Sequence, residues 1–424
     1  MPGVADINNA FAVNLNGGGL ELRNDTGFNK NYTSVRINVN NASTLTYNNT
    51  NTTSYSLEFS GANAFVVGAD LTVRNLSSGN LTAANQFNIS RNMTGSGNLI
   101  IETLNTAFTD TSASFSPGRI QLSGNNSGFN GNVTVSKGNL QLSGSTGANL
   151  LGNGILTLGT TGDSASAGLA FNTSQNQTVA NNIVVATGGF RAIKDNSGVG
   201  GNYSVDLTGT MTLNGNLTID HGLAADRTFT VSGNITGGGD LAIVRNQNSA
   251  ASRAIITGTN TYTGTTTVAT GAALILDGSV TSNTSVANAA RFGGDGTITG
   301  NLSLDSGARF VFTAGATLDV SGATSFDNSF DLTSLVNASG GAVDWSLVSE
   351  GTYTLIAVTA SSLSNIGNFG IGNIGTLGDK QGFFQGTTGL QLVVIPETST
   401  WAIVGIGLFG MVVFHRIRRR SRGA

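Results

Sequence analysis

His221 is the only histidine outside the C-terminal tail, and it could take part in acid–base chemistry. Asp220, Asp226 and Arg227 lie beside it in the sequence, and a histidine next to a carboxylate can serve as a general acid or base. The other histidine, His415, belongs to a basic C-terminal segment. A single histidine in a polar turn is usually solvated, so we expect His221 to be exposed and assign no catalytic residue.

Metal and thiol chemistry find little support in the composition. The chain has 424 residues, no cysteine and two histidines, which excludes disulfides, thiolate nucleophiles and cysteine-bound metals and leaves few ligands for a transition metal. Residues 237–240 (GGGD) and 293–296 (GGDG) are similar to calcium-binding solenoid repeats, but the required register does not recur. We interpret both as tight turns and expect no metal and no cofactor.

Gly405, Gly407 and Gly410 match the spacing G-x-G-x-x-G of dinucleotide-binding loops. That fingerprint needs a strand before it and an acidic residue about 20 positions after it. Here the glycines lie inside an apolar C-terminal run. We interpret them as small residues that allow close helix packing.

The charge distribution argues against a nucleic-acid partner. Five of the 20 basic residues lie in the last nine positions, so residues 1–395 hold 15 basic and 22 acidic residues, a net charge of −7. A body of that sign with no basic stripe repels a phosphate backbone. We therefore expect no nucleic-acid binding.

The elements that must position any site are short strands. Apolar and polar residues alternate in 35–39 (VRINV), 71–73 (LTV), 133–135 (VTV) and 140–142 (LQL), and 310–312 (FVF) is a short apolar run; glycine, asparagine, aspartate or serine lies within three residues after each run. This pattern is typical of many short β-strands. Helix-forming residues are diluted by 60 glycines and by asparagine, threonine and serine.

Two stretches, 122–144 and 256–278, share one pattern. Each has an aromatic residue, a glycine two positions later, a valine four after that, a glycine three further on, and the ending L-x-L-x-G. The equivalent pairs are Phe129 and Tyr262, Gly131 and Gly264, Val135 and Val268, and Gly138 and Gly271.

Repetition of this kind predicts a stacked fold. A short strand cannot bury its apolar side alone, whereas successive repeats bury a continuous core, and asparagine, threonine and serine can form hydrogen-bonded ladders between coils. We expect an all-β, parallel right-handed β-helix or solenoid with roughly 20–25 residues per coil. The alternative is an antiparallel β-sandwich.

The second stretch resembles the autotransporter-associated β-strand repeat. The matching residues are Gly258, Asn260, Tyr262, Gly264, Val268, Gly271, Leu274 and Gly278. The first stretch departs from the family by having phenylalanine in place of tyrosine. Members of that family are exported bacterial proteins, often adhesive or structural, so the resemblance implies a secreted β-helix.

The C-terminal segment has three parts in order. Pro396, Glu397 and Thr398 precede an apolar run (401–414), and basic residues follow it. The residues that we assign to the membrane run are Trp401, Gly405, Gly407, Gly410 and Phe414, and the basic anchor consists of Arg416, Arg418, Arg419, Arg420 and Arg422.

The apolar run predicts one transmembrane helix. It is shorter than the ~20 residues of a full span, but an interfacial tryptophan and snorkelling arginines can extend it. The positive-inside rule places the arginines in the cytoplasm and the body outside. A buried core helix is the alternative, although such a helix rarely borders an arginine cluster.

This tail resembles the PEP-CTERM sorting signal of Gram-negative bacteria, which consists of a Pro-Glu-Pro motif, a hydrophobic helix and a basic end. Thr398 replaces the second proline here. The resemblance implies processing by the membrane protease exosortase, followed by release or surface attachment. No signal peptide is visible at the start, so we expect a misplaced start or a fragment; a cytoplasmic protein is the alternative.

These observations predict three regions: a β-solenoid at 1–340, closing strands at 341–395, and a sorting and membrane segment at 396–422. We expect an exported, non-enzymatic surface or extracellular protein of structural or adhesive type. Its expected partners are an exosortase-type protease, membrane lipid and extracellular polysaccharide. The alternative is a β-helical polysaccharide lyase or glycoside hydrolase, which would need two carboxylates roughly 5–10 Å apart across a groove.

Overall fold

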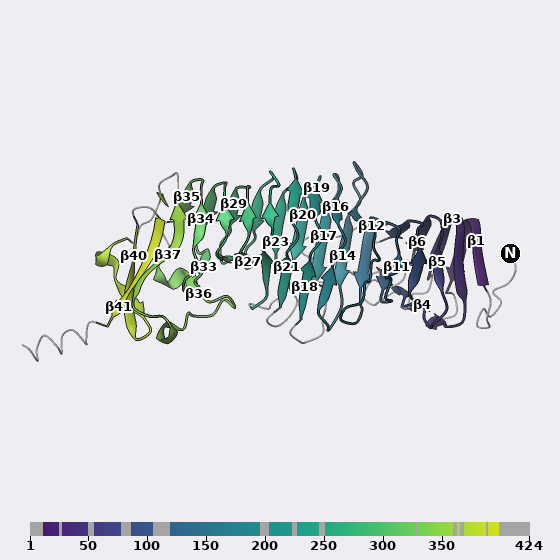
Figure 1. The fold of residues 1–424 in the computed structure, drawn as a ribbon, viewed down its shortest axis with the longest axis horizontal. Helices are drawn as coiled ribbons and strands as arrows, with labels where there is room; N and C mark the ends of the chain where they lie inside the picture. Colours follow the sequence, from purple (N-terminus) through teal and green to yellow (C-terminus); the bar gives the residue numbers. More distant parts are fainter. Residues whose placement is uncertain are drawn as a thin grey trace, which may run out of the picture.

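The protein is an elongated stack of β-coils. In the computed structural model the chain runs from β1 (Ala12–Arg23) at one end of the long axis to β41 (Gly389–Pro396) near the other (Figure 1). The structure describes residues 12–24, 28–49, 55–77, 86–104, 119–195, 203–222, 227–245, 251–327, 330–358, 363–364, 369–386 and 389–397.

The strands form three sheets. The 25-stranded sheet contains β1, β2 (Lys30–Tyr32), β3 (Arg36–Asn48), β4 (Leu57–Phe59), β5 (Phe65–Val67), β6 (Leu71–Asn75), β7 (Gln86–Ile89), β8 (Met93–Gly95), β9 (Leu99–Thr103), β10 (Arg119–Leu122), β11 (Gly128–Phe129), β12 (Val133–Leu142), β13 (Leu156–Leu158), β14 (Ala167–Phe171), β16 (Ile183–Val185), β17 (Arg191–Asp195), β19 (Met211–Leu213), β20 (Leu217–Asp220), β22 (Ile235–Gly237), β23 (Leu241–Val244), β26 (Thr266–Val268), β29 (Thr284–Val286), β32 (Leu302–Leu304), β35 (Thr324–Phe326) and β38 (Leu363–Ser364).

The two other sheets have eight strands each. One contains β15 (Gln177–Val179), β18 (Ser204–Leu207), β21 (Thr228–Val231), β24 (Arg253–Ile256), β27 (Ala273–Leu276), β30 (Arg291–Gly293), β33 (Arg309–Val311) and β36 (Leu335–Val336). The other contains β25 (Thr259–Asn260), β28 (Ser279–Val280), β31 (Thr297–Ile298), β34 (Leu318–Val320), β37 (Gly351–Val358), β39 (Gly375–Leu377), β40 (Lys380–Gln385) and β41. Short 3₁₀ helices are η1 (Leu332–Ser334), η2 (Trp345–Leu347) and η3 (Ile371–Asn373).

Successive coils pair in parallel, as the predicted solenoid requires, and this excludes the antiparallel sandwich for the body. Leu217 on β20 pairs with Leu241 on β23, which pairs in turn with Thr266 on β26. Coil length is less uniform than expected. The coil from β9 to β12 is long, because Leu99 pairs with Val133, whereas β26, β29 and β32 follow one another through short coils.

The alternating runs form the core, as predicted. Ile183, Met211 and Ile235 lie in register on neighbouring coils, and each is at most 1% exposed. Burial of such an aliphatic side chain contributes about 1.5–3 kcal/mol. Because every coil adds its inward residues to the same rows, the apolar interior runs continuously along the stack.

The repeated glycines lie at corners where coils come close. A Cβ on Gly131 would lie 1.9 Å from the carbonyl oxygen of Gly97, and one on Gly264 would lie 2.2 Å from that of Gly239. Gly271 has a φ of +74°, which side-chain-bearing residues rarely adopt. The pattern shared by 122–144 and 256–278 therefore marks positions at which only glycine fits.

The expected amide ladders are present. Asn98 N–H donates to Oδ1 of Asp70 (3.1 Å), and Asn132 N–H donates to Oδ1 of Asn98 (3.1 Å). At another corner Asn301 N–H donates to Oδ1 of Asn283 (2.9 Å). Each side-chain oxygen thus caps a backbone N–H one coil further on and satisfies a donor at a corner between strands.

The last strands reverse direction. β37 pairs in parallel with β34 on one side and antiparallel with β41 on the other, and β40 and β39 continue this antiparallel arrangement. Within the described part of the chain, no helix has the length and apolar character that a membrane span requires.

Candidate functional site

The predicted sorting and membrane residues fall mostly outside the described part of the chain. Pro396 ends β41, where it pairs with Lys380, and Glu397 is the last described residue. The following predicted residues lie outside the described residues: Asp226, Thr398, Trp401, Gly405, Gly407, Gly410, Phe414, Arg416, Arg418, Arg419, Arg420 and Arg422.

The expectation of an exposed His221 is wrong, because the corner that carries it faces the core. His221 is 0% exposed, its Nε2 accepts the N–H of Ala273 (3.0 Å), and its Nδ1 lies 3.2 Å from Oγ of Ser252. Burial, together with the positive charges of Arg245 and Arg291, lowers its pKa to about 3. The imidazole is therefore neutral and bridges neighbouring coils.

The acidic neighbour of the histidine is engaged with another partner. Asp220 forms an ion pair with Lys194 (3.3 Å), and a second buried pair joins Arg227 to Asp195 (3.1 Å). Tyr203 donates its hydroxyl to Asp195 and lies under the Arg227 guanidinium at 4.0 Å. Removal of one partner of a buried pair typically costs about 3–5 kcal/mol. The charged side chains described here are thus paired with one another, which indicates a structural role.

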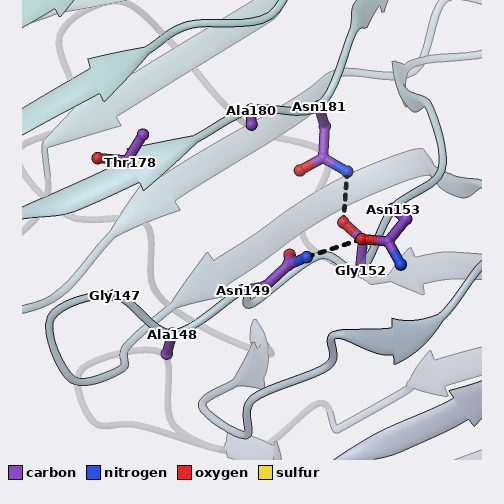
Figure 2. A pocket seen from close by; sticks show the side chains of 8 residues that line it. All are labelled: Gly147, Ala148, Asn149, Gly152, Asn153, Thr178, Ala180 and Asn181. Carbon is purple, nitrogen blue, oxygen red and sulfur yellow. Dashed lines mark hydrogen bonds between the residues drawn. The ribbon is translucent and has the colours of Figure 1, made fainter.

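An uncharged hollow opens between the loops of two neighbouring coils, the loop before β13 and the one before β16. Figure 2 shows that Asn149, Asn153 and Asn181 extend from neighbouring loops toward it, and its volume is about 310 Å³. Asn149 Nδ2 donates to Oδ1 of Asn153 (3.1 Å), and Asn181 Nδ2 donates to the carbonyl of Gly152 (2.9 Å). Fixed amides without charge suit the hydroxyl groups of a neutral sugar.

A larger groove of about 590 Å³ lies on the outer side of the row β24–β27–β30–β33. We call it the axial groove. Its lining residues are Arg253, Ile255, Ile275, Asp277, Gly294, Asp295, Val311, Thr313, Gly315, Ala316 and Ala338.

The floor of the axial groove is a row with one position per coil. Ile255, Ile275, Gly293 and Val311 pair successively in parallel register. A Cβ on Gly293 would lie 2.6 Å from the carbonyl oxygen of Val311, so glycine allows the next coil to approach. The row runs along the rod axis because parallel strands stack in that direction.

Two aspartates form one wall of the groove. Asp277 and Asp295 are exposed and occupy the same place on successive coils, two residues after the floor positions Ile275 and Gly293. Asp277 Oδ1 accepts the N–H of Asp295 (3.3 Å), and Asp295 Oδ1 accepts that of Thr317 (2.8 Å). Their carboxylates are therefore fixed by the backbone of the next coil.

A buried arginine holds the opposite wall. Arg291 is 3% exposed; its Nη1 donates to the carbonyl of Ala338 (2.7 Å) and its Nη2 to that of Ser252 (2.8 Å). Ala338 lies at the edge of the groove. Arg291 thus ties the segment after β36 to the coil that carries β24.

Sequence reasoning missed this groove. Residues 293–296 were interpreted as a tight turn, and the structure places Gly294 and Asp295 in the wall. The sequence does show aspartate at both 277 and 295. The two align on neighbouring coils only if one coil has 18 residues, and the sequence alone does not reveal the length of each coil. Among the described residues, no group of three or more histidine, aspartate or glutamate side chains could hold a metal ion.

No protein-family model matches the chain, and neither a curated protein nor a solved structure matches it. The function is therefore inferred from the residues that the fold brings together.

Proposed function

We propose that this protein is an exported, non-enzymatic rod that presents its polar surface outside the cell for structural or adhesive contact, with extracellular polysaccharide as a partner. The observation that carries the proposal is the capping of corner N–H groups by asparagine and aspartate on neighbouring coils, as between Asn98 and Asn132. Those ladders satisfy the backbone without disulfides or metals. They also leave rows of amides on the surface, which suit hydrogen bonding to sugars.

The proposal includes delivery through the C-terminal segment. We propose that 401–414 enters the inner membrane, that the arginines stay in the cytoplasm, and that an exosortase-type protease acts near Pro396. In support, Pro396 is the last residue of β41, at the end of the rod opposite β1 (Figure 1). We also propose that the β-solenoid is right-handed, because parallel β-crossovers are right-handed in nearly all cases.

The test is to map the C-terminus of the native protein by mass spectrometry in each cell fraction. We expect a terminus near Pro396 in the outer envelope or the medium. An intact chain ending at Ala424 in the cytosol would overturn the export proposal. A variant with glutamine at the five tail arginines should stay inside the cell, while one with glutamine at the body residues Arg36 and Arg309, which are exposed, should be sorted normally.

One observation favours a second candidate, a glycoside hydrolase: Asp277 and Asp295 lie one coil apart in the axial groove. Neighbouring coils are separated by about 4.8 Å, close to the carboxylate separation of retaining enzymes. However, both carboxylates are exposed and both accept a backbone N–H, so nothing in their surroundings separates an acid from a nucleophile. Release of reducing ends from a polysaccharide, lost in Asp277→Asn, would establish this candidate in place of the first.

A further inference from the structure

We infer that the axial groove is a binding site for a linear polysaccharide that carries free ammonium groups, such as a polymer of unacetylated amino sugars. The inference rests on the proposed function and assigns a ligand class to one place on the rod. It concerns binding alone, so no bond is formed or broken.

The shape of the groove favours a linear polymer. Its floor is an apolar row in which Ile255 and Ile275 are half-exposed and Val311 closes one end. That row follows the rod axis, so an extended chain can lie along it and place the C–H faces of its rings on the isoleucines. The turn with Thr313 and Gly315 bounds the groove beside Val311.

The charge of the groove favours a cationic ligand. Asp277 and Asp295 form no ion pair with any described residue. Arg253, the cation among the described lining residues, donates from Nη1 to the carbonyl of Ala251 (3.4 Å). Two exposed carboxylates therefore face the ligand, whereas the guanidiniums of Arg253 and of the buried Arg291 are each held by backbone carbonyls. A uronic acid polymer would bring like charges to this wall, which complementary binding sites avoid.

The carboxylates are also fixed in advance. Each uses Oδ1 to accept a backbone N–H from the next coil, so little side-chain freedom is lost on binding. They recur once per coil, at a spacing of about 4.8 Å. A polymer with one ammonium group per sugar can therefore meet both on one face.

The ladders make a clean test possible, because asparagine already fills the same capping role at other corners, as Asn283 does for Asn301. Asp277→Asn together with Asp295→Asn removes both charges and keeps both Oδ1 acceptors. The matched control is Asp70→Asn, since Asp70 is exposed and caps Asn98 in the same way but lies outside the groove.

The experiment is titration calorimetry of the full-length chain in detergent with a glucosamine oligomer. The N-acetylglucosamine oligomer and the galacturonate oligomer of the same length serve as comparison probes. We expect the glucosamine oligomer to bind tightest, and the double variant to weaken that binding by about tenfold or more, with Asp70→Asn unchanged. Higher salt should weaken wild-type binding and have little effect on the double variant.

Equal affinity of wild type and the double variant for the glucosamine oligomer would overturn the inference, as would tighter binding of galacturonate. Circular dichroism of each variant confirms that a loss of affinity is not a loss of fold. Because the assay uses purified protein, it is independent of export. If the protein is exported but does not bind the glucosamine oligomer, only this inference is refuted. If the protein binds the oligomer but is found in the cytosol, only the proposed function is refuted.

Discussion

At the residue scale, the asparagine that precedes the aromatic residue of each repeat is a buried link between coils. Asn260 is 0% exposed; its Oδ1 accepts the N–H of Ile235 (2.8 Å), and its Nδ2 donates to the carbonyls of Gly258 (2.8 Å) and Ser279 (2.9 Å). One side chain therefore joins three consecutive coils. Asn126 of the first repeat is also buried and bonds to the coils on either side of it, which explains physically why the repeat pattern contains this asparagine.

We predict that Asn260→Ala lowers the free energy of unfolding by about 3 kcal/mol, because it takes the side-chain acceptor from the buried Ile235 N–H and removes the bonds to the carbonyls of Gly258 and Ser279. Chemical denaturation monitored by circular dichroism measures the change. The control is Asn283→Ala, at an exposed position that caps one N–H, with an expected loss of about 1 kcal/mol. Equal losses in the two variants would contradict the role assigned to Asn260.

The buried histidine predicts a dependence of stability on pH. The pKa of His221 is about 3 in the fold, below its ordinary value of 6.5, so the unfolded chain binds more protons between these values. The contribution of the neutral His221 to the free energy of unfolding is complete above pH 6.5. It decreases as the pH falls below that value, by up to about 1.4 kcal/mol per pH unit.

Between pH 6.5 and 5, the free energy of unfolding of wild type should therefore fall more steeply than that of His221→Gln. Urea titrations at several pH values measure both slopes. Parallel slopes would show that His221 is not buried in its neutral form.

At the element scale, the period-two alternation sufficed to predict the strands, while the repeated stretches predicted the parallel stack and the abundant asparagine, threonine and serine predicted the ladders. It could not predict what happens at corners. One turn of the coil separates Asn98 from Asn132 but also Asn283 from Asn301, because residues are inserted between strands without any change in the strand pattern. The inward orientation of His221 and the alignment of the two groove aspartates both depend on corner geometry, so neither could be read from spacing alone.

The corner glycines give a prediction at this scale. In Gly264→Ala the new Cβ would meet the Gly239 carbonyl, so the coils must separate, and we expect a loss of about 2–3 kcal/mol. Gly238→Ala is the matched control, because its Cβ would have no neighbour nearer than 3.9 Å, and it should be neutral or stabilise by about 0.5 kcal/mol. Thermal unfolding of both variants measures the difference; a stable Gly264→Ala would show that the corner can relax.

At the scale of the whole molecule, the antiparallel strands β37, β39, β40 and β41 occupy the end of the sheet that β25, β28, β31 and β34 build. An uncovered end would present unpaired backbone groups to other chains. The sequence prediction of closing strands at 341–395 assigns them this protective role. The parallel-to-antiparallel switch after β34 is the geometry that would support it.

The direction of the ladders has a mechanical consequence. Hydrogen bonds between coils lie along the rod axis, so a load applied between the two ends opens them one coil at a time. Each released coil lengthens the chain by about 60–120 Å, at about 3.3–3.6 Å per residue. Single-molecule pulling should therefore give a series of unequal steps, the shortest from the coils between β26 and β32. A molecule under tension between a cell and its surroundings would then yield gradually and dissipate work at each step.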